Sequence, residues 1–245
     1  MNDSASRIVV AEVFVSISNH TAEGEKLIKE VHAEEPGVPV VFTIPLWDPT
    51  SLQQSFVGKA DAAGDGTDKA KVSVILVGHS AGGVLARLYL SPDPFLGRSY
   101  RGLERVNHLI KLGSPHHSKG SRRRGGRLSR YIEKHYPGAY FQPEVRYTSF
   151  AGKFLRGDRA GSRSQRWAYD RYQEICGQGD TWGDGLIPIQ AALLKGSDQV
   201  ILDGISHYSV FGNPWYGSSA AIPKWWGRAE DGHASGQSEQ PSVGS

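Results

Sequence analysis

The sequence predicts an α/β fold, a mostly parallel sheet of about six strands with helices on both faces. The first observation is a series of short Val- and Ile-rich runs that are apolar on both faces, as is typical of buried parallel strands. These runs lie at 8–17, 39–45, 72–77, 106–112, 145–151 and 199–203. The second observation is that stretches with helical spacing alternate with the runs. These stretches lie at 22–32, 83–90, 128–135 and 166–175. Such alternation predicts a ligand site at the carboxyl ends of the strands.

The 245 residues are long enough for one domain with its own core, and no internal repeat divides them. We expect this domain to span residues 1–227, with a cap or lid insertion at about 116–143. Residues 228–245 are rich in Gly, Ser, Gln and Glu and offer little surface to bury. A disordered tail is therefore expected there.

The composition excludes several classes of function. The 28 basic and 25 acidic residues give a formal net charge of only +3, which does not favour a nucleic acid as partner. The single Cys176 can form neither an internal disulfide nor a cysteine-based metal motif. No apolar run reaches the roughly 20 residues of a transmembrane helix, and Glu12 within the run 7–17 argues against a signal peptide. An intracellular protein, in the cytoplasm or an organelle, is expected.

The segment GHSAGG at 78–83 is the strongest chemical signal. It follows the apolar run at 72–77 and opens directly into helical spacing. In that context a Gly-x-Ser-x-Gly motif predicts a nucleophile elbow, a sharp strand-to-helix turn that holds the serine in a strained backbone conformation. Gly78 and Gly82 leave the room that such a turn needs. Ser80 is therefore the predicted nucleophile.

The helix that begins after Ser80 would aim free backbone N–H groups at the oxyanion that forms when a serine attacks a carbonyl group. The N–H of Ala81 is the expected first donor. His79 is the direct neighbour of Ser80 on the elbow, so its side chain should point away from the hydroxyl. We interpret His79 as a packing or positioning residue.

The order of residues along the chain selects the base. Around this kind of elbow the serine is followed first by an acid and then by a histidine. Of the nine histidines, His207 comes just after the last apolar run at 199–203, where an imidazole can reach back over the sheet to Ser80. The others precede the candidate acid, lie within a strand or fall in the expected tail. His207 is the predicted general base.

The stretch at 179–192 supplies the candidate acid. Asp184 is preferred because its flanking glycines allow a tight turn that presents the carboxylate. A carboxylate there would hold the tautomer of His207 and stabilise the imidazolium without taking the proton. Asp180 in the same stretch is the reserve candidate. Asp203, four residues before His207, is interpreted as structural.

These segments together resemble the α/β-hydrolase superfamily, and within it a lipase- and esterase-like group. GHSAGG resembles the lipase box. LGSPHHS at 112–118 is similar to the LGTPH segment of lipases and of GPI inositol-deacylase-like proteins. GDGLIP at 183–188 and LDGISHY at 202–208 resemble the acid and histidine loops of that group. Plant and cyanobacterial esterase-like proteins are similar as well, and the resemblance runs in order from residue 72 to about 210.

The resemblance implies that the predicted triad hydrolyses an ester or a lipid-like substrate without a cofactor or a metal ion. It also implies a sheet in which the strand at 8–17 lies between the strands at 39–45 and 72–77. The alternative is a catalytically weak or inactive member of the fold that binds a ligand or a partner.

The first seventy residues depart from the pattern of that group. Its lipases place an HG or PG dipeptide after the strand that matches 8–17, and this loop supplies the second oxyanion donor. Here no glycine appears before Gly24. The backbone of Ser16 or Ser18 is the expected source of that donor. This departure keeps the binding-protein alternative open.

Residues 119–130 hold six basic side chains among glycines. A mobile cap with this composition would make weak contact with a membrane surface through lipid head groups. A solvated loop is the other interpretation, and the small net charge of the chain favours it.

Overall fold

The computed structural model describes residues 8–14, 41–43, 73–95, 102–104, 106–116, 124–212 and 214–234 of the 245-residue chain. The predicted helix at 22–32, the expected donors at Ser16 and Ser18, and residues 119–123 of the basic segment 119–130 lie outside these residues.

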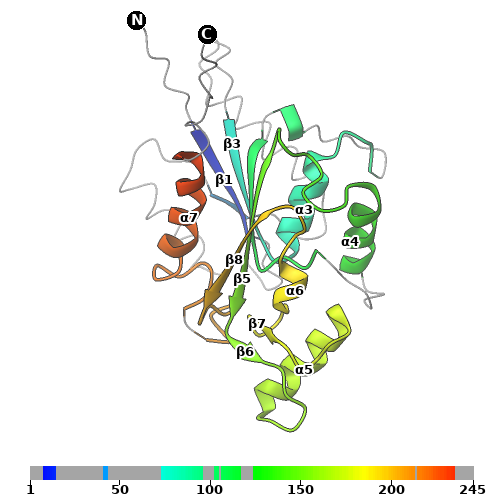
Figure 1. Cartoon of the computed structure of the whole chain (residues 1–245), viewed down its shortest axis with the longest axis vertical. Helices are drawn as coiled ribbons and strands as arrows, with labels where there is room; N and C mark the ends of the chain where they lie inside the picture. The colour runs from blue at the N-terminus through cyan, green and yellow to red at the C-terminus, as the bar shows by residue number, and fades with distance from the viewer. Residues whose placement is uncertain are drawn as a thin grey trace, which may run out of the picture.

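A six-stranded sheet in the order β2-β1-β3-β4-β5-β8 forms the centre of the fold (Figure 1). Every neighbouring pair in this sheet is parallel. Its strands are β1 (Ile8–Phe14), β2 (Val41–Thr43), β3 (Ser73–His79), β4 (Val106–Leu112), β5 (Arg146–Lys153) and β8 (Asp198–Asp203). Each predicted run overlaps one of them. The position of the first strand between the second and the third is also confirmed.

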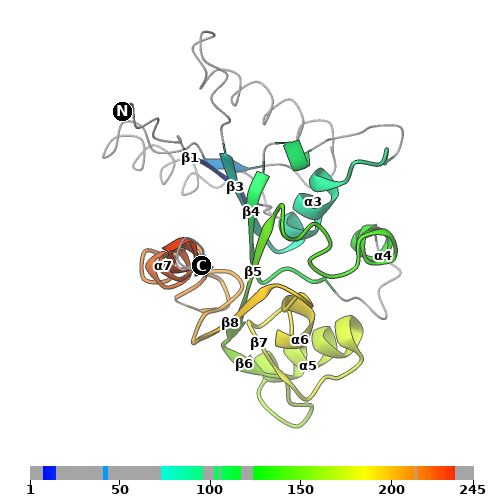
Figure 2. The ribbon, with the colours of Figure 1, turned by 45° about the horizontal axis from the view of Figure 1, so that its top comes forward.

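Helices cover both faces of the sheet. Figures 1 and 2 show α7 on one face and α3 and α4 on the other. The helices are α3 (Ala81–Leu90), α4 (Arg124–His135), α5 (Arg163–Cys176), α6 (Ile189–Ala192) and α7 (Ile222–Ala234), with a 3₁₀ turn at Gly102–Glu104. A two-stranded sheet of β6 (Leu155–Arg156) and β7 (Trp182–Gly183) lies with α5 beyond the carboxyl ends of β5 and β8 (Figure 1).

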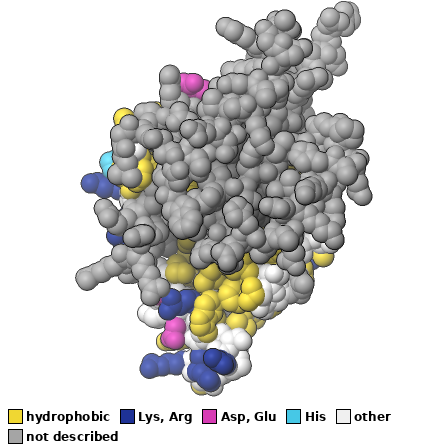
Figure 3. Space-filling model, turned by 180° about the vertical axis from the view of Figure 1, so that it is seen from behind, with side chains coloured by type: hydrophobic (Ala, Val, Ile, Leu, Met, Phe, Trp, Pro, Cys, Tyr) yellow, Lys and Arg dark blue, Asp and Glu magenta, His cyan; other side chains and the backbone are white. Residues whose placement is uncertain are grey.

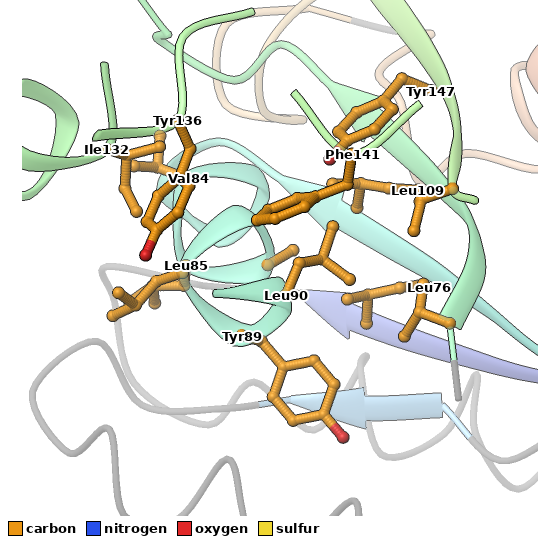
Figure 4. Close-up of a cluster of buried hydrophobic side chains, with 14 of the residues drawn as sticks. Leu76, Val84, Leu85, Tyr89, Leu90, Leu109, Ile132, Tyr136, Phe141 and Tyr147 are labelled. Atoms are coloured by element: carbon orange, nitrogen blue, oxygen red, sulfur yellow. The ribbon is translucent and has the colours of Figure 1, made fainter. Parts of the chain in front are cut away.

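Two hydrophobic clusters explain why the strands are apolar on both faces. Successive side chains of a strand point to opposite faces of the sheet. Leu76 therefore belongs to one cluster with Val84 of α3 and Ile132 of α4 (Figure 4). Its neighbour Val77 lies in the second cluster, with Trp225 of α7. The alternation of strand and helix in the sequence thus predicted the layers correctly.

The structure adds detail at two predicted boundaries. Helix α7 extends to Ala234, so residues 228–234 are helical although we expected the disordered tail to begin at 228. Pro223 near the helix start and Gly227 within it obscured this helix in the sequence. Within the predicted insertion at 116–143, Ile132, Tyr136 and Phe141 belong to the core cluster under α3. A lid in the remaining part of that range stays a prediction.

Lys111 on β4 is an unusual member of the buried core. Its side chain is 0% exposed, and its Nζ has no hydrogen-bond partner among the described residues. The Nζ of Lys111 lies over the ring of Tyr147, 4.8 Å from its centre. Burial lowers the pKa of Lys111 well below its ordinary value, and the charge of Arg87 lowers it further. Burial of Lys111 therefore opposes folding at every pH at which this side chain is protonated in the unfolded chain.

Replacing Lys111 with Met should stabilise the chain in a pH-dependent way. Between the lowered pKa and the ordinary value of 10.5, the unfolded chain binds a proton at Lys111 that the folded chain releases. Stability of the wild type therefore rises with pH in this window. Urea unfolding should show Lys111→Met to be more stable than wild type at about pH 7, with a smaller gap at about pH 10. The exposed Lys195 offers a matched Lys195→Met control. A gap that stays constant with pH would contradict this account.

Candidate active site

Ser80 occupies a sharp turn between the end of β3 and the start of α3. Its backbone has φ 53° and ψ −130°, and among the described residues it is the one non-glycine residue with a positive φ. Its N–H donates to the carbonyl of Leu112 at the end of β4 (2.9 Å), and its carbonyl accepts from the N–H of Gly83 (3.2 Å). Two neighbouring elements thus hold Ser80 in the strained conformation that the motif predicted.

Close packing around the turn explains its glycines. A Cβ on Gly78 would lie 2.5 Å from the Cα of Gly83, and a Cβ on Gly83 would lie 2.1 Å from the Oγ of Ser114. Gly82 is buried in the first turn of α3. Sequence reasoning singled out Gly78 and Gly82 but missed Gly83, because its neighbour Ser114 comes from the distant LGSPHHS segment. The third glycine of GHSAGG was the available signal.

Gly78→Ala should destabilise the fold because the added methyl meets backbone atoms that cannot move aside. We expect the free energy of unfolding to fall by about 1–3 kcal/mol or more, as in overpacked cores. Gly227→Ala in α7 is the matched control, since a Cβ there has no neighbour within 4 Å. That change should be neutral or stabilise the chain by up to about 1 kcal/mol. Equal effects in denaturant unfolding would rule out the packing explanation.

The structure brings the three predicted triad residues together. The Nε2 of His207 lies 3.0 Å from the Oγ of Ser80, and its Nδ1 lies 2.7 Å from the Oδ2 of Asp184. The side chains of His207 and Asp184 are 0% and 1% exposed. Because a carboxylate only accepts hydrogen bonds, Nδ1 carries the proton in this arrangement. Nε2 is then free to accept from the Ser80 hydroxyl.

Hydrogen bonds orient the carboxylate of Asp184. Its Oδ1 accepts from the backbone N–H groups of Leu186 (3.0 Å) and Ile187 (2.7 Å), and its Oδ2 accepts from the hydroxyl of Tyr216 (3.2 Å). The carbonyl of Asp184 accepts from the N–H of His207 (2.8 Å). The GDGLIP turn therefore holds the acid and ties it to the histidine loop.

Tyr216 is a component of the site that sequence reasoning missed. Burial, and then the charge of Asp184, raise the pKa of its phenol well above the ordinary value. Its hydroxyl thus stays protonated and remains a donor to Asp184, while it accepts from the N–H of Gly152 (2.6 Å). Nothing near Tyr216 in the sequence distinguished it from a packing residue.

The other two candidate carboxylates lie on the surface. Asp180 pairs with Arg156, at 2.9 Å between the Oδ1 and the guanidinium, and Asp203 pairs with Lys153 at 3.6 Å. Both aspartates are largely exposed. The geometry therefore favours Asp184 over the reserve Asp180 and agrees with a structural interpretation of Asp203.

His79 packs against the histidine of the site. The ring centres of His79 and His207 are 4.7 Å apart, and the His79 ring also contacts Tyr216 at 5.5 Å. Burial, and then the charge of His207, lower the pKa of His79 well below its ordinary value. A neutral, packed imidazole is in line with the packing or positioning role that we predicted.

Ala81 is the first residue of α3, so its N–H has no acceptor within the helix. This is the position of the first expected oxyanion donor. In the described part of the chain, no group of three or more His, Cys, Asp or Glu side chains could hold a metal ion. No helix among the described residues is long and apolar enough to cross a membrane.

A parallel sheet in this order, helices on both faces and a serine elbow after β3 together define the α/β-hydrolase fold. The resemblance to hydrolases of the lipase and esterase kind is confirmed. Residues 52–133 match the family model described as the PGAP1-like alpha/beta domain. No curated protein sequence matches the chain significantly.

Two solved structures share the fold at low sequence identity. The mature lipase BlEst2 of Bacillus licheniformis is 14% identical, with a TM-score of 0.58 over 93% of this chain and 94% of that one. The phospholipase PlaB of Legionella pneumophila is also 14% identical, with a TM-score of 0.55 over 97% of this chain and 67% of that one.

Proposed function

We propose that this protein is a serine hydrolase that cleaves carboxylic esters through an acyl-enzyme. The observation that carries the proposal is the continuous series of contacts from Ser80 to His207 to Asp184, buried at the carboxyl ends of the strands. Each residue has the neighbour that its role requires: the nucleophile meets a base, and the base meets an orienting carboxylate.

In the first step the Oγ of Ser80 bonds to the ester carbonyl carbon while the Nε2 of His207 takes the hydroxyl proton. The carbonyl electron pair moves to the oxygen, and the N–H of Ala81 donates to this oxyanion. Collapse of the intermediate expels the alcohol, which takes the proton from His207. Water then repeats the sequence on the acyl-enzyme, with His207 again acting as base and then as acid. Asp184 stabilises the imidazolium in both halves without being protonated.

We propose an ester with an apolar acyl group, as in lipids, for two reasons. The two solved structures that share the fold are named as a lipase and a phospholipase. Aromatic rings also continue outward from the site, because Tyr208 next to His207 contacts Phe211, and Phe211 contacts Trp167 of α5. Seen from behind, hydrophobic side chains gather at the surface toward the end of the molecule where β5 and β8 finish (Figure 3). Contact of residues 119–130 with a membrane surface remains a proposal.

Wild-type protein should hydrolyse p-nitrophenyl esters of graded chain length, and Ser80→Ala should reduce kcat by about 10⁴-fold or more, because the nucleophile is lost. His207→Ala should cause a loss of similar size. A fluorophosphonate probe should label wild type but not Ser80→Ala. Ser164→Ala, an exposed change on α5, is the matched control and should leave labelling intact. Well-folded wild type that takes no label and turns over no ester would instead favour the non-catalytic binding protein.

The two acidic candidates can be separated by paired substitutions. Asp184→Asn removes the charge that holds the His207 tautomer, so kcat should fall by about 10⁴-fold. Asp180→Asn breaks only an exposed ion pair with Arg156 and should leave kcat near the wild-type value. Steady-state kinetics with the best p-nitrophenyl ester measures both. The assignment of the acid is wrong if the Asp180 variant shows the larger loss.

A further inference from the structure

Tyr208 directly follows His207 and stands edge-on to the rings of the site. Its ring centre lies 4.4 Å from that of His207, at an interplanar angle of 88°. It lies 5.4 Å from the ring centre of His79, at 85°. On the outer side Phe211 lies 6.0 Å away. Contacts with these three rings give the Tyr208 side chain a defined orientation.

The hydroxyl of Tyr208 is buried, yet among the described residues it makes no hydrogen bond of good geometry. It lies against the hydroxyl of Ser80. This contact lowers the pKa of the phenol, but burial is the larger effect and raises it above the ordinary value. The group therefore keeps its proton at neutral pH. A buried O–H whose hydrogen bond has poor geometry gains from a better acceptor that arrives with a ligand.

The other two tyrosine hydroxyls next to Asp184 are already used. Tyr216 donates to Asp184 and accepts from Gly152, as described above. Tyr172 donates to the carbonyl of Leu155 (3.1 Å) and accepts from the N–H of Gly185 (2.9 Å). Tyr208 is thus the tyrosine of the described site whose O–H remains available to a substrate.

We propose that the hydroxyl of Tyr208 is a second hydrogen-bond donor to the oxyanion, beside the N–H of Ala81. The inference rests on the ester hydrolysis proposed above. The oxyanion forms on the oxygen of the carbon that Ser80 attacks, two bonds from the Ser80 Oγ. A donor that already lies against this Oγ is close to where the negative charge develops. When the intermediate collapses, the electron pair returns to the carbonyl and the bond to the alcohol breaks, while Tyr208 retains its proton throughout.

This assignment places the second oxyanion donor on the loop that carries His207. Sequence reasoning looked for it in the backbone of Ser16 or Ser18, because in similar lipases the loop after the first strand supplies it. A side-chain donor differs from a backbone donor in one useful way, since a single substitution removes it. Tyr208→Phe deletes the O–H and keeps the ring that packs against His207.

Tyr208→Phe should lower kcat for the best p-nitrophenyl ester by about 10²–10³-fold with little change in KM, because the lost interaction belongs to the transition state. Affinity for a trifluoromethyl ketone with the same acyl group should fall by a similar factor, since Ser80 adds to this ketone and forms a stable oxyanion. The variant should fold with the wild-type Tm, because the hydroxyl makes no hydrogen bond of good geometry to the described residues. Tyr140→Phe is the matched control, as Tyr140 is 54% exposed on the turn between α4 and β5.

Values of kcat and ketone affinity within about twofold of wild type in Tyr208→Phe would overturn this inference. A raised KM with unchanged kcat would overturn it as well, because the hydroxyl would then bind the ground state. In both cases wild-type turnover leaves the proposed ester hydrolysis intact. Absence of turnover in wild type would instead overturn the proposed function together with the inference built on it.

Discussion

The backbone conformation of Ser80 depends on three segments that approach each other unusually closely. The end of β3, the first turn of α3 and the end of β4 meet at this residue, and the packing leaves no room for a Cβ at Gly78 or Gly83. Hydrogen bonds from Ser80 to Leu112 and from Gly83 to Ser80 hold a positive φ that a serine adopts at a cost. The serine side chain is short and its backbone is fixed by this turn. The position of the Ser80 hydroxyl is therefore set by the central sheet.

The triad candidates are buried, and hydrogen bonds to neighbouring groups orient the carboxylate of Asp184 and the ring of His207. Asp184 is held by two backbone N–H groups of its own turn and by Tyr216, while Trp225 of α7 donates to the carbonyl of Tyr216 at 2.9 Å. Helix α7 therefore supports the acid although it lies on the far face of the sheet from α3. In a buried site, electrostatic interactions between such groups are stronger than at the surface, and an unpaired polar group is more costly.

Lys111 and Tyr208 both carry a buried polar atom that makes no hydrogen bond of good geometry to the described residues, and they differ in what lies around them. Lys111 points into the packed core under α3, against the ring of Tyr147, and its burial opposes folding. Tyr208 lies against the hydroxyl of Ser80, where we propose that a substrate oxygen accepts its hydrogen bond. A poorly satisfied polar group thus affects stability at Lys111, whereas at Tyr208 we propose that it serves the reaction.

Local sequence determined the layers of the fold, the elbow and the turn that presents Asp184, because strand and helix periodicity and the GHSAGG and GDGLIP turns depend on neighbouring residues. It did not reveal α7, whose pattern Pro223 and Gly227 obscure, and it could not decide between Asp184 and Asp180 by geometry. The tertiary structure also decided the contacts of Gly83 and Tyr216, and those on which the role proposed for Tyr208 rests. Each of these roles depends on contacts between residues far apart in the chain, and such contacts exist only after the sheet has brought its strand ends together.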